Sequence, residues 1–139
     1  MTPTLDATPH IDAAVAAIKA VRIPNDVYPF GEVPGTNRKG ANSGTEPATY
    51  LRVTVERRYM EATRMVGRAG RVAWRVSVRS ASTNPRNTRQ GLLDASTALN
   101  EARLVVAGQT STPIQHETTN DLDYDDGYYL ADVIFTYVC

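Results

Sequence analysis

The residues that could carry out chemistry are few and scattered along this 139-residue chain. The two histidines, His10 and His116, stand in no HExxH or catalytic-triad spacing, and we expect each to be an ordinary surface or partly buried histidine. Cys139 is the single cysteine, so no disulfide within the chain and no four-ligand Cys/His zinc site can form. Glycine-rich phosphate loops and a GxSxG nucleophile motif are absent from the sequence. We therefore expect no catalytic residue, no metal site and no cofactor.

A cluster of acidic residues comes closest to a cation site. A calcium loop beginning at Asp121 would place Asp123 and Asp125 at ligand positions. It would also need glycine at the sixth position, where this chain has Asp126, and helices on both sides, whereas a strand is predicted to follow. We interpret the cluster as an acidic turn over residues 120–127 that supplies counter-charges to arginines. A small enzyme with a cryptic acid site there is a minor alternative.

Charge is segregated along the chain although the formal total is zero. Residues 1–37 have a net charge of −2, residues 38–93 carry twelve cations against three acids, and residues 94–139 have a net charge of −7. Thirteen of the fifteen cations are arginines, which pair bidentately with carboxylate or phosphate. The basic and acidic segments could neutralise each other within the fold, bind each other between copies, or bind nucleic acid. The pI of about 6.7 argues against the last of these.

Two helices are predicted to position these charges. Residues 8–22 have apolar side chains at helical spacing, with Thr8 as a candidate cap and proline at the first helical position. The second helix begins after Ser82 or Asn84, with Pro85 in its first turn and an apolar stripe that extends to Ala102.

Alternation of apolar and polar side chains predicts strands. Residues 71–80 show it most clearly, with Trp74 on the core face and Arg71, Arg75 and Arg79 in a basic stripe on the other. Residues 128–138 are apolar on both faces, which indicates a strand central in its sheet or covered by another subunit. Further extended segments are predicted at 27–33, 49–59, 103–107 and 111–118.

The segment 34–48 has a different composition, dominated by Gly, Pro, Asn, Ser and Thr, with Arg38 and Lys39 in its middle. It cannot bury enough apolar surface to order itself, so we predict a mobile loop that is either a partner contact or a solvated linker. The predicted fold class is therefore α+β. One compact domain over residues 1–139 would contain a mainly antiparallel sheet with two helices packed on it. No apolar run is long enough to span a membrane, and the first residues do not form a secretory signal.

Several segments together resemble the tail terminator (tail-completion) proteins of long-tailed, non-contractile bacteriophages, particularly those that infect actinobacteria. An Ala-rich first helix is followed by VYPFGEVP, and after a Gly/Asn-rich gap come a strand segment, a second helix and a closing strand segment. These segments are VYPFGEVP (27–34), ATYLRVTVERRY (48–59), NPRNTRQGLLDA (84–95) and DDGYYLADVIFTYV (125–138). The resemblance covers nearly the whole chain in order.

The resemblance implies a structural virion protein without catalytic residues, assembled in the host cytoplasm. Such proteins form a ring, here expected to have six subunits, on the head-proximal end of the tail tube. The ring stops tube polymerisation and offers a surface to the neck of the capsid. The implied partners are further copies of this chain, the tail tube protein and a neck or head-completion protein, with genomic DNA passing through the ring without specific binding.

A ring needs two different, complementary surfaces on each subunit, and the segregated charges could supply them. We expect basic residues of one subunit to face acidic residues of its neighbour, and the 34–48 loop to contact the tube or neck. The candidate interface residues are Arg57, Arg58, Arg71, Arg75, Arg79, Asp121, Asp123, Asp125 and Asp126, and the candidate loop contacts are Arg38 and Lys39. Two alternatives remain open: a neck or head-completion connector, and a nucleic-acid-binding module that uses the basic strand face.

Overall fold

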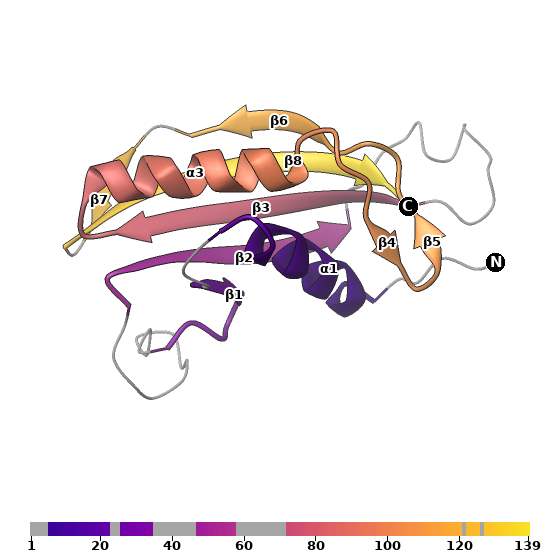
Figure 1. Ribbon diagram of the computed structural model, residues 1–139, viewed down its shortest axis with the longest axis horizontal. Helices are drawn as coiled ribbons and strands as arrows, with labels where there is room; N and C mark the ends of the chain where they lie inside the picture. Colours follow the sequence, from indigo (N-terminus) through magenta and orange to yellow (C-terminus); the bar gives the residue numbers. More distant parts are fainter. Residues whose placement is uncertain (1–5, 23–25, 35–46, 58–71, 121, 126) are drawn as a thin grey trace.

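The computed structural model describes residues 6–22, 26–34, 47–57, 72–120, 122–125 and 127–139. Within these ranges two helices lie on one face of a six-stranded sheet, and a short two-stranded sheet stands near the C-terminus (Figure 1). The helices are α1 (Thr8–Lys19) and α3 (Pro85–Leu99). The strands are β1 (Val27–Pro29), β2 (Thr49–Arg57), β3 (Ala73–Ser82), β4 (Val105–Val106), β5 (Gln109–Thr110), β6 (Gln115–Thr119), β7 (Asp123–Asp125) and β8 (Tyr128–Val138).

The large sheet has the strand order β1-β2-β3-β8-β6, and β7 pairs with β8 on the side of β6. The β1–β2 pair is parallel, whereas β2–β3, β3–β8, β6–β8 and β7–β8 are antiparallel. This arrangement confirms the predicted α+β class with a mainly antiparallel sheet. β8 lies between β3 and β6, which confirms that its two apolar faces mark a central strand.

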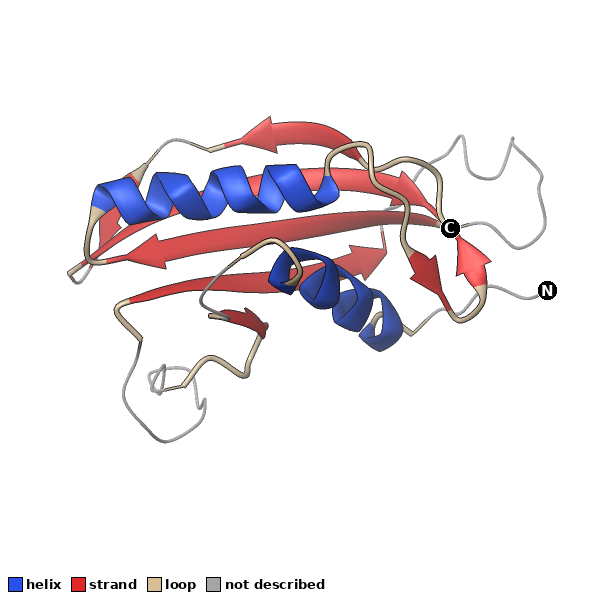
Figure 2. Cartoon of the chain, viewed as in Figure 1, coloured by secondary structure: helices blue, strands red, loops and turns tan. Residues whose placement is uncertain are grey.

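The two helices lie over the strands of the large sheet (Figure 2). Alternating side chains of β2, β3 and β8 form the core beneath them. Val53, Val78 and Val133 lie opposite one another on three neighbouring strands, and each is at most 1% exposed. Trp74 is fully buried, as its place on the inner face of a strand predicts. The helices pack onto this layer through small and aliphatic residues, which are Ala14, Val15 and Ile18 of α1 and Ala95 and Leu99 of α3.

The first residues of α3 are capped as the sequence predicts, whereas those of α1 are capped differently. Asn84 caps α3, because its side-chain oxygen accepts the backbone N–H of Arg86 at 2.9 Å. Thr8, the predicted cap of the first helix, is instead its first residue. The carboxylate of Asp6 accepts the Thr8 N–H at 2.9 Å, and hydrogen bonding to Thr8 lowers the pKa of Asp6.

The acidic segment is only partly the turn that its composition predicts. Asp123 to Asp125 form strand β7, which pairs with residues 128–130 of β8. Gly127, which precedes β8, has a φ of 87°, a left-handed conformation that glycine adopts without strain. Most of the predicted mobile loop, residues 35–46, lies outside the described residues.

His10 is a core residue, contrary to the expectation of an ordinary surface or partly buried histidine. Its side chain is 1% exposed, its ring stacks on Trp74 at a centroid distance of 3.9 Å, and its Nδ1 lies 2.7 Å from the Tyr137 hydroxyl. Burial lowers the pKa of His10, a shift that the charge of Asp6 partly opposes. Its Nε2 has no hydrogen-bond partner among the described residues, so a second ring proton would be unsatisfied in the core.

This burial predicts a loss of stability at mildly acidic pH. The folded protein binds the His10 proton less readily than the unfolded chain does, so the histidine's contribution to stability is complete above its ordinary pKa of about 6.5 and is lost progressively below it. We expect the free energy of unfolding to fall by up to about 1.4 kcal/mol per pH unit below that value. Urea unfolding between pH 7.5 and 5 measures this slope. His10→Gln should flatten it, whereas His116→Gln, a change at an exposed residue of β6, should leave it unchanged; equal slopes for wild type and His10→Gln would contradict the prediction.

Candidate functional site

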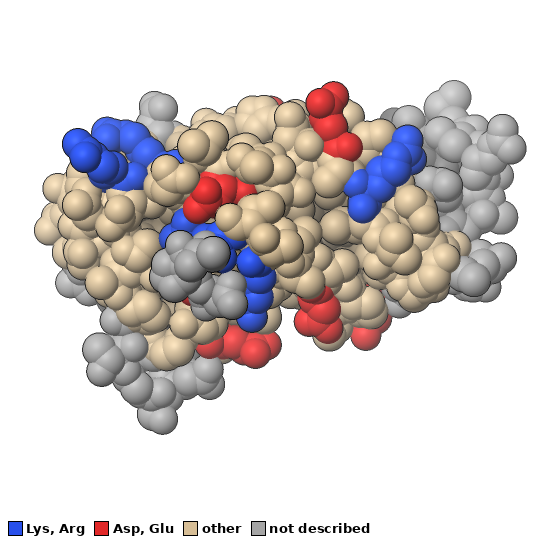
Figure 3. Space-filling view, viewed as in Figure 1, with Lys and Arg blue, Asp and Glu red and all other residues tan. Residues whose placement is uncertain are grey.

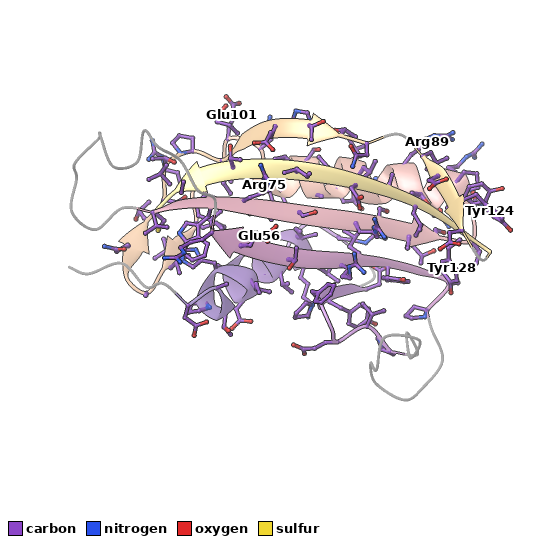
Figure 4. The ribbon with its side chains drawn as sticks, turned by 180° about the vertical axis from the view of Figure 1, so that it is seen from behind. Glu56, Arg75, Arg89, Glu101, Tyr124 and Tyr128 are labelled. Carbon is purple, nitrogen blue, oxygen red and sulfur yellow. The ribbon has the colours of Figure 1, made fainter. Side chains whose placement is uncertain are left out.

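The face of the sheet opposite the helices carries no described helix (Figures 1 and 4), and we call it the open face. The outward side chains of β2, β3 and β8 therefore have no helix among the described elements packed on them. They are mainly half-buried by one another. At one end Tyr28 and Val33 pack on Tyr50 and Ala81 of this face. Figure 4 looks onto this face, with Glu56 on β2 beside Arg75 on β3. The charged members of the face within the described strands are Arg52, Glu56, Arg75, Arg79, Glu117, Asp123, Asp125 and Asp132.

Arg79 and Asp132 form a bidentate ion pair in the middle of this face. The two residues lie directly opposite each other on β3 and β8, with Nε to Oδ1 at 2.8 Å and Nη2 to Oδ2 at 3.1 Å. The hydrogen bonds to Asp132 raise the pKa of Arg79 despite its partial burial, and Asp123 adds to the effect. Two parallel hydrogen bonds join the guanidinium to the carboxylate, so each charge has its partner within the chain.

Arg75 is also paired within the chain. Its Nη2 lies 3.3 Å from Oε2 of Glu117 on β6, and Glu56 stands directly opposite it on β2. The basic stripe predicted on this strand is therefore real as a row of side chains, but two of its arginines are paired with the chain's own carboxylates. A phosphate backbone would have to displace these carboxylates, which weakens the case for nucleic-acid binding at this face.

Arg52 differs from these two arginines. Its guanidinium carbon lies 5.0 Å from the centre of the Phe30 ring, and no hydrogen bond or ion pair joins it to a carboxylate of the described residues. Burial lowers the pKa of Arg52, and the positive charge of Arg79 directly opposite on β3 lowers it further. Phe30 is 61% exposed, so a desolvated cation and an exposed ring lie together at the β1–β2 edge.

The opposite edge of the sheet is acidic. Asp123 and Asp125 lie on the exposed strand β7, and Tyr124 between them is 59% exposed. A hollow of about 400 Å³ lies beside this strand. Its lining includes three carboxylates and the guanidinium of Arg79 and is formed by Arg79, Asn120, Asp123, Tyr124, Asp125, Leu130, Ala131 and Asp132.

The structure brings only part of the predicted interface together. Asp123 lies close enough to Arg79 to affect its pKa, whereas Arg57 is exposed at the other end of the strands, opposite Trp74. Six candidates lie outside the described residues: Arg38, Lys39, Arg58, Arg71, Asp121 and Asp126.

No sequence motif singled out Arg52, Phe30, Glu117 or Asp132 as interface residues. Alternation in the 49–59 segment does put Arg52 on the outer face, but the partner of each charge depends on strand register. That register joins positions 53 residues apart in the Arg79–Asp132 pair.

Charges on the helix side of the molecule are mixed. Figure 3 shows Lys and Arg in small groups there, interspersed with Asp and Glu, and no broad patch of one sign. A second hollow on this side, of about 500 Å³, is bordered by Arg22, Asp26 and Asp94, and Arg22 forms an ion pair with each of the two aspartates. The described part of the chain holds no group of three or more His, Cys, Asp or Glu arranged to bind a metal ion. Nor does any helix in that part have the length and apolar character needed to cross a membrane.

The fold has counterparts among solved structures. No protein-family model matches this chain, and no curated protein matches it. A solved chain from the virion of a native gene transfer agent particle superposes with a TM-score of 0.58 at 13% identity, over 93% of this chain and 86% of that one. A second solved chain superposes with a TM-score of 0.55 at 14% identity, over 94% and 90%. At these identities the comparisons show that the fold is shared.

Proposed function

We propose that this chain is a structural protein of a phage-like virion, and that it caps the head-proximal end of a tail tube as a ring of six copies. The observation that carries the proposal is the shared fold with a chain of a gene transfer agent virion, which spans nearly the whole length of both chains. The resemblance of the sequence to tail terminators supplies the narrower role and the number six.

The geometry of the sheet supports assembly into a closed ring. A ring forms when two different surfaces of each subunit bind each other head to tail and the rotation closes. The sheet offers an edge with Arg52 and Phe30 and, across β3 and β8, an edge with the exposed acids of β7. In the proposed role the ring ends tube polymerisation, presents a joining surface to the neck of the capsid, and lets genomic DNA pass without reading its sequence.

Deletion of the gene from the phage genome tests this role. We expect lysates to contain DNA-filled heads beside unattached tails of uncontrolled length, because both the stop signal and the joining surface are lost. Negative-stain electron microscopy measures the tail lengths and the fraction of joined particles. A plasmid copy of the wild-type gene is the control and should restore both.

Two other results would contradict the terminator role. Tails of normal length beside heads that leak or lack necks would assign the protein to the neck, which is the alternative virion position. Intact, infectious particles would show that the protein is not an essential part of the virion, and nucleic-acid binding that weakens steeply with salt would then be the next activity to test.

A further inference from the structure

Four charged side chains form a row across the open face of the sheet, and their charge changes from positive at one end to negative at the other. From one edge to the other the row contains Arg52 on β2, Arg79 on β3, Asp132 on β8 and Asp123 on β7. The two central members neutralise each other in the bidentate pair. The row therefore leaves a positive charge toward the β1–β2 edge and negative charge at the β7 edge, on opposite sides of the same subunit.

The positive end of the row has no ion-pair partner among the described residues. Arg52 is half-buried, its nearest neighbour on β3 is another arginine, and its observed contact is with the face of Phe30. A cation–π contact contributes about 0.5–2 kcal/mol, and a carboxylate placed beside the same guanidinium would add a charge-assisted hydrogen bond. Arg52 is thus prepared for an anionic partner that the described part of the subunit does not supply.

The negative end of the row offers such a partner. Asp123 and Asp125 are exposed on a three-residue strand, and no ion pair of either is found within the described residues. They border the hollow beside Arg79 and Asp132, which is large enough to receive a side chain from outside. Because both carboxylates point to the open face, as Leu130 and Tyr128 opposite them do, they share that face with Arg52.

We infer that Arg52 and Phe30 at the β1–β2 edge of one copy bind Asp123 and Asp125 at the β7 edge of a second copy. The occupant is a copy of this chain because the two ends of the row are complementary in charge and lie on opposite edges, so each copy can give one end and receive the other. The inference rests on the proposed ring and specifies which residues join neighbouring subunits. It assigns the contact between subunits to Arg52, because Arg75 and Arg79 are paired within the chain.

A cross-linking experiment on the full-length protein tests the contact. In a Cys139→Ala background, Glu32→Cys places a thiol two residues beyond Phe30, and Tyr124→Cys places one between the two acids. The two proteins are mixed in equal amounts and treated with a short bis-maleimide reagent. We expect the mixture to give a covalent dimer, and either protein alone to give far less, because a head-to-tail contact joins unlike edges.

Charge variants show whether the named ion pair holds the contact. Arg52→Glu in the Glu32→Cys protein should lower the dimer yield by about tenfold or more, and Asp123→Lys with Asp125→Lys in its Tyr124→Cys partner should restore part of it. Lys19→Glu makes the same change in charge at an exposed residue of α1 and should leave the yield unchanged. Circular dichroism of each variant separates loss of contact from loss of fold.

The inference is overturned if the Glu32→Cys and Tyr124→Cys mixture yields no more dimer than a mixture with Val105→Cys, an exposed position on β4. It is equally overturned if Arg52→Glu and Lys19→Glu behave alike. Either failure would leave the gene-deletion result intact, since tails of uncontrolled length report the role and not the contact. Conversely, a correct contact with intact particles after deletion would reject the role alone.

Discussion

Replacing Arg22 with methionine is expected to lower the free energy of unfolding by about 3–5 kcal/mol. Arg22 follows α1, and its side chain is 6% exposed. Its Nη2 donates to Asp26 at 3.0 Å, and its Nη1 donates to Asp94 of α3 at 2.6 Å. Burial disfavours the charge, but these two carboxylates outweigh it and raise the pKa of Arg22. Methionine keeps most of the length and leaves two partly buried carboxylates facing each other without a cation.

The effect can be measured by urea unfolding followed by fluorescence, because Trp74 is the single tryptophan and is fully buried. Adding Asp26→Asn and Asp94→Asn to Arg22→Met should recover a large part of the loss, since the isolated charges are then gone. Lys19→Met is the matched control, at the exposed last residue of α1, and should change stability by less than about 0.5 kcal/mol. A loss below about 1 kcal/mol for Arg22→Met would contradict the prediction.

Replacing Gly91 with alanine is expected to destabilise the fold by about 1–3 kcal/mol, although alanine favours helix by about 1 kcal/mol over glycine. Gly91 lies where α3 crosses the sheet. An added Cβ there would overlap the Ser80 hydroxyl and lie 2.7 Å from Cδ2 of Leu51. The Ser80 hydroxyl cannot move freely, because it donates to the carbonyl of Thr88 at 2.8 Å in the core.

A double-mutant cycle identifies the cause. Ser80→Ala removes the overlapping oxygen, so Gly91→Ala should cost less in that background than in the wild type. Thr97→Ala, at an exposed position of α3, isolates the gain in helix propensity and should be neutral or stabilising. If Gly91→Ala stabilises the protein as Thr97→Ala does, the close approach of α3 to β3 is not what requires glycine.

Close contacts of this kind show where prediction from the sequence stops. The helical spacing around Ile18 and the alternation around Trp74 are local patterns, and they correctly predicted both helices and the long strands. The same patterns could not place His10 in the core or show that Gly91 meets Ser80, because both contacts form only when separate helices and strands pack against each other. Composition also failed for Asp123 to Asp125, which pair with β8 as a strand although aspartates favour turns.

The candidate assembly surface, too, could be predicted from the sequence only in part. The sequence determined that the chain has a strongly basic middle, an acidic last third, and arginines on the outer face of its strands, since charge and alternation are properties of residue order. Only the tertiary structure decided which charges are already paired. Strand register sets Arg79 against Asp132 and brings Glu117 to Arg75, while Arg52 is left beside Phe30. Alternation in the sequence sets which face of the sheet a side chain takes. Which residues then lie opposite each other on neighbouring strands depends also on the turns and on how the whole sheet packs against its helices.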